Sequence, residues 1–361
     1  MKRPQHLFAL ASVATAVALA LGTAPASAGG SEEAILKSAI VMITNWGDDT
    51  VSVVDLDSGS QLAEIKVGPK PYDVKLDPTG RTAYVSNSAA SELSVIDVQA
   101  MLEAHRIQVG FSPRDMALSK DGKFLIVANS GDGTVSRVDL KAGKETQVIP
   151  VGAIPYGTQL YDQDQKVIVT NWGENTVSYV DLAAGKELGK TAVGVLPYTV
   201  AVAPGQSTAY VTNFGSGTVS RLDLKTMTAT GTLAVGKAPW GLGISRDGKR
   251  LGVANFSSHD LSIIDAVAFK ETARHYVGGR LNVATADTKS KADTTAPSPQ
   301  QAPQAAARTK NVAMSEDGRL MVWTDLANNT VNVTDTTTGD VLRTIKVGKA
   351  PYGVTFLRKP A

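Results

Sequence analysis

The chain has 361 residues, of which 36 are Lys or Arg and 34 are Asp or Glu, so its formal net charge is only +2. This balance argues against a protein that wraps nucleic acid, because such proteins show a basic excess. The sequence contains no Cys, which excludes disulfide bonds, a catalytic thiolate and a haem attached through a Cys-x-x-Cys-His motif.

Residues 1–28 are expected to be a signal peptide. Lys2 and Arg3 precede an apolar stretch from Leu7 to Leu21, and Ala26-Ser27-Ala28 is the small-x-small pattern after which signal peptidases cut. The stretch is short for a membrane span, although a retained anchor is the alternative. We therefore predict cleavage after Ala28, a periplasmic mature protein with no transmembrane segment, and a mature formal charge of zero.

From residue 40 onward, a unit of 42 residues repeats. Each copy has an Asn that closes a short apolar run, an Asp ten residues later and a Val-Gly pair further on. In the last copy Asp325 takes the place of the Asn, 70 residues after Asn255, so the preceding unit holds 28 extra residues. Seven units in register indicate a closed repeat array. The marks are Asn45, Asn87, Asn129, Asn171, Asn213 and Asn255; Asp55, Asp97, Asp139, Asp181, Asp223, Asp265 and Asp335; and Gly68, Gly110, Gly152, Gly194, Gly236, Gly278 and Gly348.

One unit reads as four short strands, called a to d, over residues 240–245, 250–255, 261–265 and 271–277. Gly, Asp and Asn turns separate them, which is typical of the antiparallel sheet of a propeller blade. We therefore predict an all-β fold over residues 40–361, after an N-terminal segment at 29–39. The fold is a seven-bladed β-propeller of four-stranded antiparallel blades.

The chain enters this ring at a strand b, residues 40–45, and ends with an unpartnered strand a, residues 352–357. The C-terminal strand is therefore predicted to complete the N-terminal blade, which leaves no open sheet edge in the ring.

The repeated marks are expected to be architectural. Asp and Asn at strand ends bond the N–H groups of turns, and every blade needs the same turns. The Gly of Val-Gly is expected at a backbone bend with positive φ. Function is therefore expected from the positions at which the copies differ.

The same residues carry a family resemblance. Tyr210-Val211-Thr212-Asn213, Gly217-Thr218-Val219-Ser220 and Pro239-Trp240-Gly241 resemble the YVTN-type β-propeller repeat. Similar runs cover essentially the whole mature chain. The resemblance implies an exported bacterial propeller similar to the YncE group. It implies no particular chemistry, because similar propellers include surface proteins, nucleic-acid binders and subunits of quinoprotein dehydrogenases.

Two sets of loops are predicted to share one face of the ring, the d–a connections and the b–c turns, because antiparallel strands alternate in direction. Aromatic and cationic residues gather there and are expected to surround the mouth of the central channel. In the d–a connections they are Tyr72, Arg114, Tyr156, Tyr198, Trp240, Lys310 and Tyr352, and in the b–c turns Trp46, Trp172, Phe214 and Phe256.

Two interpretations of this face remain open. It is a platform for a ligand or partner, because Tyr and Trp dominate binding surfaces, or each aromatic is a wedge that packs over the neighbouring blade. Arg114 and Lys310 interrupt the aromatic series, and Asp73 and Asp115 stand where other copies have Gly or Thr. Asp73, Arg114 and Asp115 are expected to form one polar cluster at the channel rim, either as a ligand site or as ion pairs.

No catalytic set is recognisable. His105, His259 and His275 are not spaced as metal ligands, and only His259 falls in a turn of the aromatic face. No Gly-x-Ser-x-Gly, phosphate loop or Ser-x-x-Lys occurs. The sequence identifies no cofactor and leaves a metal held by carboxylates in the channel open.

The extra stretch, residues 279–308, is rich in Ala, Pro, Gln and Thr and is expected to be disordered. It replaces a d–a connection, so it emerges on the aromatic face. It is interpreted as a tolerated insertion, with a lid or tether over the channel as the alternative.

Three functions follow from these observations. The first is a non-catalytic, monomeric binding propeller that holds a partner protein or small ligand on its aromatic face. The second is an enzyme, or a quinoprotein-type redox subunit, with its site at the channel mouth. The third is single-stranded nucleic-acid binding, in which bases stack on the aromatics beside Arg114 and Lys310; the neutral charge disfavours it.

Overall fold

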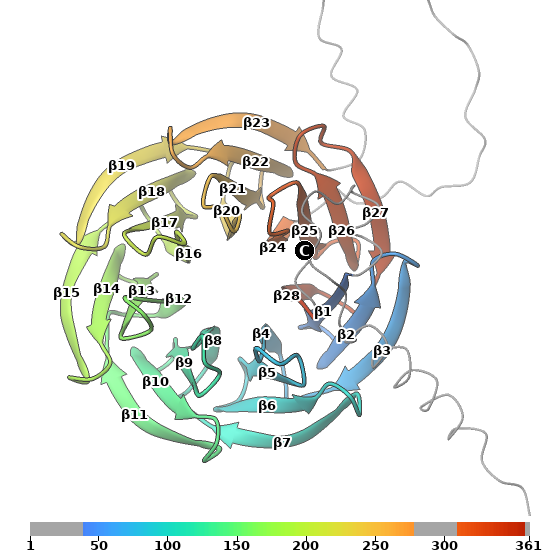
Figure 1. The fold of residues 1–361 in the computed structure, drawn as a ribbon, viewed down its shortest axis with the longest axis horizontal. Coiled ribbons are helices and arrows are strands. Elements are labelled where there is room, and N and C mark those ends of the chain that lie inside the picture. The colour runs from blue at the N-terminus through green and yellow to red at the C-terminus, as the bar shows by residue number, and fades with distance from the viewer. Residues whose placement is uncertain (1–38, 278–308, 358–361) are drawn as a thin grey trace, which may run out of the picture.

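The computed structural model describes residues 39–277 and 309–357. The expected signal peptide, the N-terminal segment before residue 39 and the insert at 279–308 lie outside the described residues. The rest forms seven four-stranded antiparallel sheets around a central axis, as Figure 1 shows. The predicted seven-bladed propeller is confirmed.

Each blade runs from an inner strand beside the axis to an outer strand at the rim (Figure 1). The inner strands are β4 (Pro71–Leu76), β8 (Pro113–Leu118), β12 (Pro155–Tyr161), β16 (Pro197–Val202), β20 (Pro239–Ile244), β24 (Thr309–Met314) and β28 (Pro351–Phe356). The second strands are β1 (Ile40–Asn45), β5 (Thr82–Asn87), β9 (Phe124–Asn129), β13 (Lys166–Asn171), β17 (Thr208–Asn213), β21 (Arg250–Asn255) and β25 (Leu320–Asp325). The third strands are β2 (Thr50–Asp55), β6 (Glu92–Asp97), β10 (Thr134–Asp139), β14 (Thr176–Asp181), β18 (Thr218–Asp223), β22 (Asp260–Asp265) and β26 (Thr330–Asp335). The outer strands are β3 (Ser60–Lys66), β7 (Leu102–Gln108), β11 (Lys144–Pro150), β15 (Lys186–Ala192), β19 (Thr228–Ala234), β23 (Lys270–Tyr276) and β27 (Val341–Lys346).

The first blade is closed by the last strand, as predicted. Its order is β28-β1-β2-β3, and β28 pairs antiparallel with β1 through Val41 opposite Phe356 and Ile43 opposite Val354. The Leu357 N–H extends the pairing by donating to the Ile40 carbonyl at 2.7 Å. The two ends of the ring are therefore held in one sheet.

The hydrophobic core is divided among the interfaces between neighbouring blades. Seven buried clusters each combine residues of two adjacent sheets. In one of them, Ile43 and Val54 of the first blade meet Val322 and Val333 of the seventh. The second strands of the blades are buried on both faces, as in β1 and β5, so each sheet gives one face to each of its two neighbours. Each blade is consequently stabilised by contact with the next, as in other repeat proteins.

The repeated Asp performs the turn role predicted for it, whereas of the six repeated Asn residues only Asn213 accepts a loop N–H, that of Gly194 at 3.1 Å. The Ala142 N–H donates to Asp139 Oδ1 at 2.8 Å, and the same bond recurs at Asp181. Asn129 is fully buried instead. Its Nδ2 donates to the hydroxyls of Thr134 and Ser136 on the next strand, at 3.1 and 2.6 Å. The Asn therefore joins two strands of its own blade.

The Gly of Val-Gly is conserved across the copies for a steric reason, so the expected positive φ was wrong. Gly110 has no positive φ. A Cβ at Gly110 would come within 2.5 Å of Asn129 Nδ2 in the following blade. This Gly and the next blade's Asn therefore fit together as a pair, which couples two of the repeated marks.

Candidate binding site on the aromatic face

Seven side chains meet on the channel axis because of a shared backbone irregularity. In each inner strand, the pairing with the second strand shifts between the first and fourth residues, for example between Pro71 and Val74. Such bulges bend a strand and redirect its side chains. We call the residues at the second position of the inner strands the inner ring: Tyr72, Arg114, Tyr156, Tyr198, Trp240, Lys310 and Tyr352.

The inner ring is a closed circuit in which every member contacts the next. The ring centroids of Tyr156 and Tyr198 are 4.8 Å apart, and those of Tyr198 and Trp240 are 4.4 Å apart. The Lys310 ammonium lies 3.2 Å from the Trp240 ring centroid and 4.2 Å from that of Tyr352. Tyr352 returns to Tyr72 at 5.0 Å, and the guanidinium of Arg114 lies 5.0 Å from the ring centroid of Tyr72 and 5.2 Å from that of Tyr156.

The inner ring fills this end of the channel. The Tyr72 and Tyr198 hydroxyls, from the second and fifth blades, hydrogen-bond to each other across the axis. Both residues are buried, and burial raises the pKa of Tyr198 well above its ordinary value. A ligand therefore cannot enter between these rings without separating them.

The aromatic residues of the b–c turns, which we call the outer aromatics, lie between successive members of the inner ring. Trp172 contacts both Tyr156 and Tyr198, with centroids at 5.3 and 5.5 Å. Phe214 lies 5.3 Å from Trp240. The remaining two repeat the arrangement, with Trp46 at 6.3 Å from Tyr352 and Phe256 at 5.4 Å from Trp240. These contacts are those of a wedge between blades, and all four outer aromatics are half-buried, so each also presents an edge to solvent.

The two cations of the inner ring have different surroundings. Lys310 is only 4% exposed, and its ammonium donates to the Tyr352 hydroxyl at 2.7 Å. Arg114 is half-buried, and its Nε donates to Ser130 Oγ at 3.1 Å. Among residues 39–277 and 309–357, Arg114 forms no ion pair. The guanidinium of Arg114 is therefore not neutralised by a carboxylate of the described residues.

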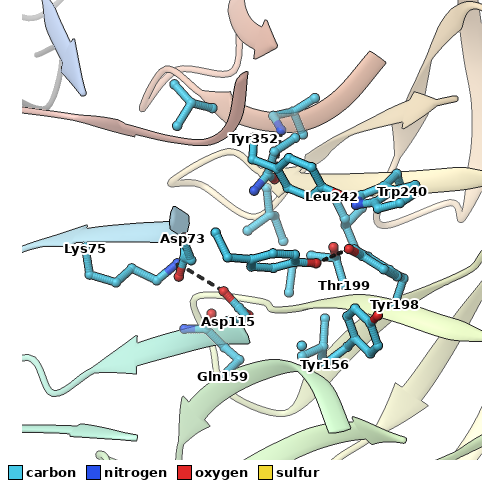
Figure 2. A pocket seen from close by; sticks show the side chains of 18 residues that line it. Asp73, Lys75, Asp115, Tyr156, Gln159, Tyr198, Thr199, Trp240, Leu242 and Tyr352 are labelled. Carbon is cyan, nitrogen blue, oxygen red and sulfur yellow. Dashed lines mark hydrogen bonds and ion pairs between the residues drawn. The ribbon is translucent and has the colours of Figure 1, made fainter. Parts of the chain in front are cut away.

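A polar cluster lies next to the inner ring, but its cation is not the predicted one. Lys75 Nζ lies 3.0 Å from Asp73 Oδ2 and 3.4 Å from Asp115 Oδ1. The predicted grouping of Asp73, Arg114 and Asp115 was wrong in Arg114, whose guanidinium packs on the rings. We call Asp73, Lys75 and Asp115 the channel cluster (Figure 2). Lys75 was not identified from the sequence. It departs from the repeat as the two carboxylates do, since the equivalent residues in other copies include Ala117 and Ala201.

Each carboxylate of the channel cluster also joins two blades. Asp73 Oδ2 accepts the Met116 N–H at 3.0 Å, and Asp115 Oδ2 accepts the Thr158 N–H at 2.9 Å. Desolvation raises the pKa of Asp115 to about 7, a shift that Lys75 partly offsets and Asp73 increases. For Lys75, burial opposes the charged form, but the two carboxylates outweigh it and raise the pKa. The Lys75 side chain is 33% exposed and lines a cavity in the channel.

The channel cluster lines a cavity of about 200 Å³ beneath the inner ring. Figure 2 shows Lys75, Asp73, Asp115 and Gln159 on one side of it and Tyr198, Trp240 and Tyr352 on the other. Inner-strand residues such as Leu242 and Val354 complete its wall. At roughly 30 Å³ per molecule, the cavity has room for six or seven waters, or for one small molecule of that size.

The remaining sequence candidate, His259, serves the backbone of its turn. It adopts a positive φ of 57°, its N–H donates to the Asn255 carbonyl, and its carbonyl accepts the Val277 N–H. Within the described ranges, no three His, Asp or Glu side chains are grouped as metal ligands. The same ranges contain no helix long and apolar enough to cross a membrane.

Sequence reasoning missed an exposed apolar surface on this face. Phe111, Ile154 and Val195 lie on three consecutive d–a connections, between the second and fifth blades, and their exposed fractions are 57%, 43% and 49%. We call them the apolar arc. Trp172 and Phe214 stand on b–c turns of the same blades. The repeat obscured this signal, because the three residues occupy two different positions in the connection.

Comparisons with known proteins support the fold. Residues 41–149 match the family described as "Lactonase, 7-bladed beta-propeller", and no curated protein matches the chain. Hydrazine synthase from Kuenenia stuttgartiensis is 16% identical with a TM-score of 0.66, over 78% of this chain and 88% of that one.

Two further solved structures are similar. A functionally unknown protein from Desulfotomaculum acetoxidans DSM 771 is 14% identical with a TM-score of 0.70, covering 88% of this chain and 98% of that one. The dihydro-haem d1 dehydrogenase NirN is 13% identical with a TM-score of 0.62, covering 93% of this chain and 78% of that one. At these identities the likeness concerns the propeller fold alone.

Proposed function

We propose that this protein is a non-catalytic binding propeller that holds a partner protein against its aromatic face. The observation that carries the proposal is the apolar arc, three large exposed apolar side chains on consecutive loops. Large apolar residues exposed on neighbouring loops of one face are candidates for an interaction site. The proposal includes export to the periplasm as a monomer and kinship with the YVTN repeat proteins of the YncE group.

A partner protein fits this face better than a small ligand at the channel mouth. The inner ring packs on itself, and Tyr72 and Tyr198 are buried. The surface left for binding includes the apolar arc and, beside it, the half-buried edges of Trp172 and Phe214. Aromatic residues beside an apolar patch are enriched at protein interfaces.

The test compares two triple variants. Phe111→Ser, Ile154→Ser and Val195→Ser together remove the apolar arc. The matched control is Leu102→Ser, Leu188→Ser and Val267→Ser, which removes three comparably exposed apolar residues from outer strands and a c–d turn. Immobilised protein is exposed to periplasmic extract, captured proteins are identified by mass spectrometry, and each is purified and re-bound.

We expect the arc variant to weaken re-binding at least tenfold, while the control and the wild type bind alike. Equal affinity of all three proteins for every captured partner would reject the proposal. Thermal melts of the three proteins establish that the variants are folded, since substitutions of exposed residues have small effects on stability.

The second candidate function is an enzyme with its site in the channel cavity. It is supported by Asp115, a carboxyl group whose pKa is raised to about 7 and which could accept or donate a proton near neutral pH. The stretch that matches the lactonase family, residues 41–149, contains the whole channel cluster. A panel of lactones tests it: turnover that is lost in Asp115→Asn supports this function, and no turnover of any lactone by the wild type counts against it.

A further inference from the structure

The outer aromatics leave a gap above one member of the inner ring. The residue after the conserved Asn is Trp or Phe in four blades, but it is Ser88 in the second blade and Ser130 in the third. By the arrangement seen for Trp172, these two positions flank Arg114. A serine is too small to cover a neighbouring side chain as an indole does, so the edge of Arg114 is left open on this face.

Arg114 is held rigidly at this gap. Its guanidinium lies between the rings of Tyr72 and Tyr156, and its Nε donates to Ser130 Oγ, which in turn donates to the Ser112 carbonyl at 3.0 Å. A guanidinium carries five N–H donors, and in the described part of the chain only the Nε–H has an acceptor. The four terminal N–H groups form the planar fork that matches a carboxylate.

The acidic groups of the neighbouring loops are already engaged. Asp132 Oδ2 accepts the Phe111 N–H at 2.6 Å. Glu174 accepts the Ala153 N–H at 2.9 Å and pairs with Lys190 at 2.8 Å. Within the described ranges no Asp or Glu forms an ion pair with Arg114, so its terminal N–H groups remain available to a carboxylate of the partner.

We infer that Arg114 is a carboxylate-recognition site, at which the partner presents an acidic side chain or its C-terminal carboxylate beside residues that cover the apolar arc. Phe111 lies in the connection that leads into β8 and Arg114 is the second residue of β8, so the acid and the apolar residues lie close together in the partner. This inference rests on the proposed function. It adds that the bound segment is acidic as well as apolar.

The probe is a random peptide library, displayed so that internal and C-terminal sequences are both represented. The wild type is expected to enrich peptides in which Asp, Glu or a free C terminus adjoins apolar residues. A selected peptide is then measured against the wild type, Arg114→Gln and Arg114→Lys. We expect Arg114→Gln to weaken binding by about tenfold or more, the loss typical of one charge-assisted hydrogen-bonding pair. Arg114→Lys should recover little, because an ammonium lacks the fork.

A double-mutant cycle separates a contact from a structural effect. Changing the acid of the peptide to its amide should weaken binding to the wild type but leave binding to Arg114→Gln unchanged. An equal loss with both proteins, or an unaffected Arg114→Gln, overturns the inference.

The apolar-arc variant distinguishes the two proposals. Loss of binding in that variant together with full binding by Arg114→Gln overturns this inference and leaves the proposed function standing. Full binding by both variants, or a library that yields no binder, counts against the proposed function itself. Tighter Arg114-dependent binding of a mixed single-stranded oligonucleotide would overturn the inference in favour of nucleic acid.

Discussion

The hydroxyl groups of Tyr72 and Tyr198 hydrogen-bond across the propeller axis, although the residues are 126 positions apart and belong to blades that do not touch through their sheets. Most other contacts between blades join immediate neighbours, as is usual for repeat proteins. This bond therefore couples opposite sides of the ring. We expect Tyr198→Phe to lower the free energy of unfolding by about 1 kcal/mol, measured by chemical denaturation.

The control for that variant is Tyr156→Phe. Tyr156 is also in the inner ring and packs on the same neighbours, but its hydroxyl makes no hydrogen bond within the described residues. It should lose less than half as much stability. Equal losses would show that the hydroxyl pair does not contribute.

Asp115 should make stability depend on pH. Its pKa in the folded protein is raised to about 7, above the ordinary value for Asp of about 4. The folded state therefore holds a proton that the unfolded state has released, and stability falls as the pH rises from about 4 to 7. In Asp115→Asn this contribution is absent, so melting temperatures recorded from pH 4.5 to 8 should fall less steeply than those of the wild type. Parallel curves would contradict the assignment.

The inner strands approach so closely that some positions exclude a side chain. A Cβ at Gly353 would lie 2.8 Å from the Tyr72 carbonyl oxygen and 3.0 Å from the Asp73 Cα. Because these are backbone atoms, which cannot move aside easily, Gly353→Ala should lower the free energy of unfolding by about 1–3 kcal/mol. Gly189→Ala on β15 is the control, since nothing lies within 4 Å of the added carbon. Denaturation midpoints should differ clearly between the two, and similar midpoints would refute the close approach.

Ile154 carries a backbone conformation that its side chain disfavours. Its φ is 51°, in the left-handed region, where a β-branched residue is strained. The side chain is exposed, so the free energy gained from its burial does not offset this strain. Ile154→Asn should therefore raise the free energy of unfolding by about 1 kcal/mol, while capture of the partner weakens. Val195→Asn is the control: Val195 has no positive φ, so this variant should weaken capture without a gain in stability. A lower free energy of unfolding in Ile154→Asn would contradict the strain at Ile154.

Removing residues 352–361 should destabilise the whole ring. The truncation takes most of β28 from β1 and removes the buried side chains of Val354 and Leu357. At about 1.5–3 kcal/mol for each buried aliphatic side chain, the loss is about 3–6 kcal/mol before the strand hydrogen bonds are counted. A melting temperature equal to that of the full chain would show that the ring does not depend on this closure. Removal of residues 358–361 alone is the control.

The fold could be predicted from the sequence because every blade repeats the same local rules. In the sixth blade, the expected strands at 240–245, 250–255, 261–265 and 271–277 fall within one residue of β20 to β23. The predicted closure by the last strand followed from counting strands. The roles of Asn and Gly were wrong because they depend on neighbours in three dimensions: the Asn bonds across to the third strand, and Gly110 makes room for the Asn of the next blade.

The candidate site could be predicted only in part. The positions of residues in the 42-residue repeat placed the inner ring and the outer aromatics on one face. These positions could not show that Tyr72 and Tyr198 reach across the axis, or that Lys75 rather than Arg114 pairs with the two carboxylates. Both outcomes depend on side-chain length and direction. The apolar arc escaped notice because exposure cannot be read from a single connection.

The pairing of β28 with β1 also bears on the order of folding. The Gly353 N–H donates to Thr44 Oγ1, a contact that spans 309 positions. Until β28 has been synthesised, the first blade has three strands and β1 presents a bare edge, the kind of edge on which other chains can pair. The chain is thus most exposed to aggregation in the interval between completion of its third strand and arrival of its last. A holding chaperone would have its greatest effect in that interval.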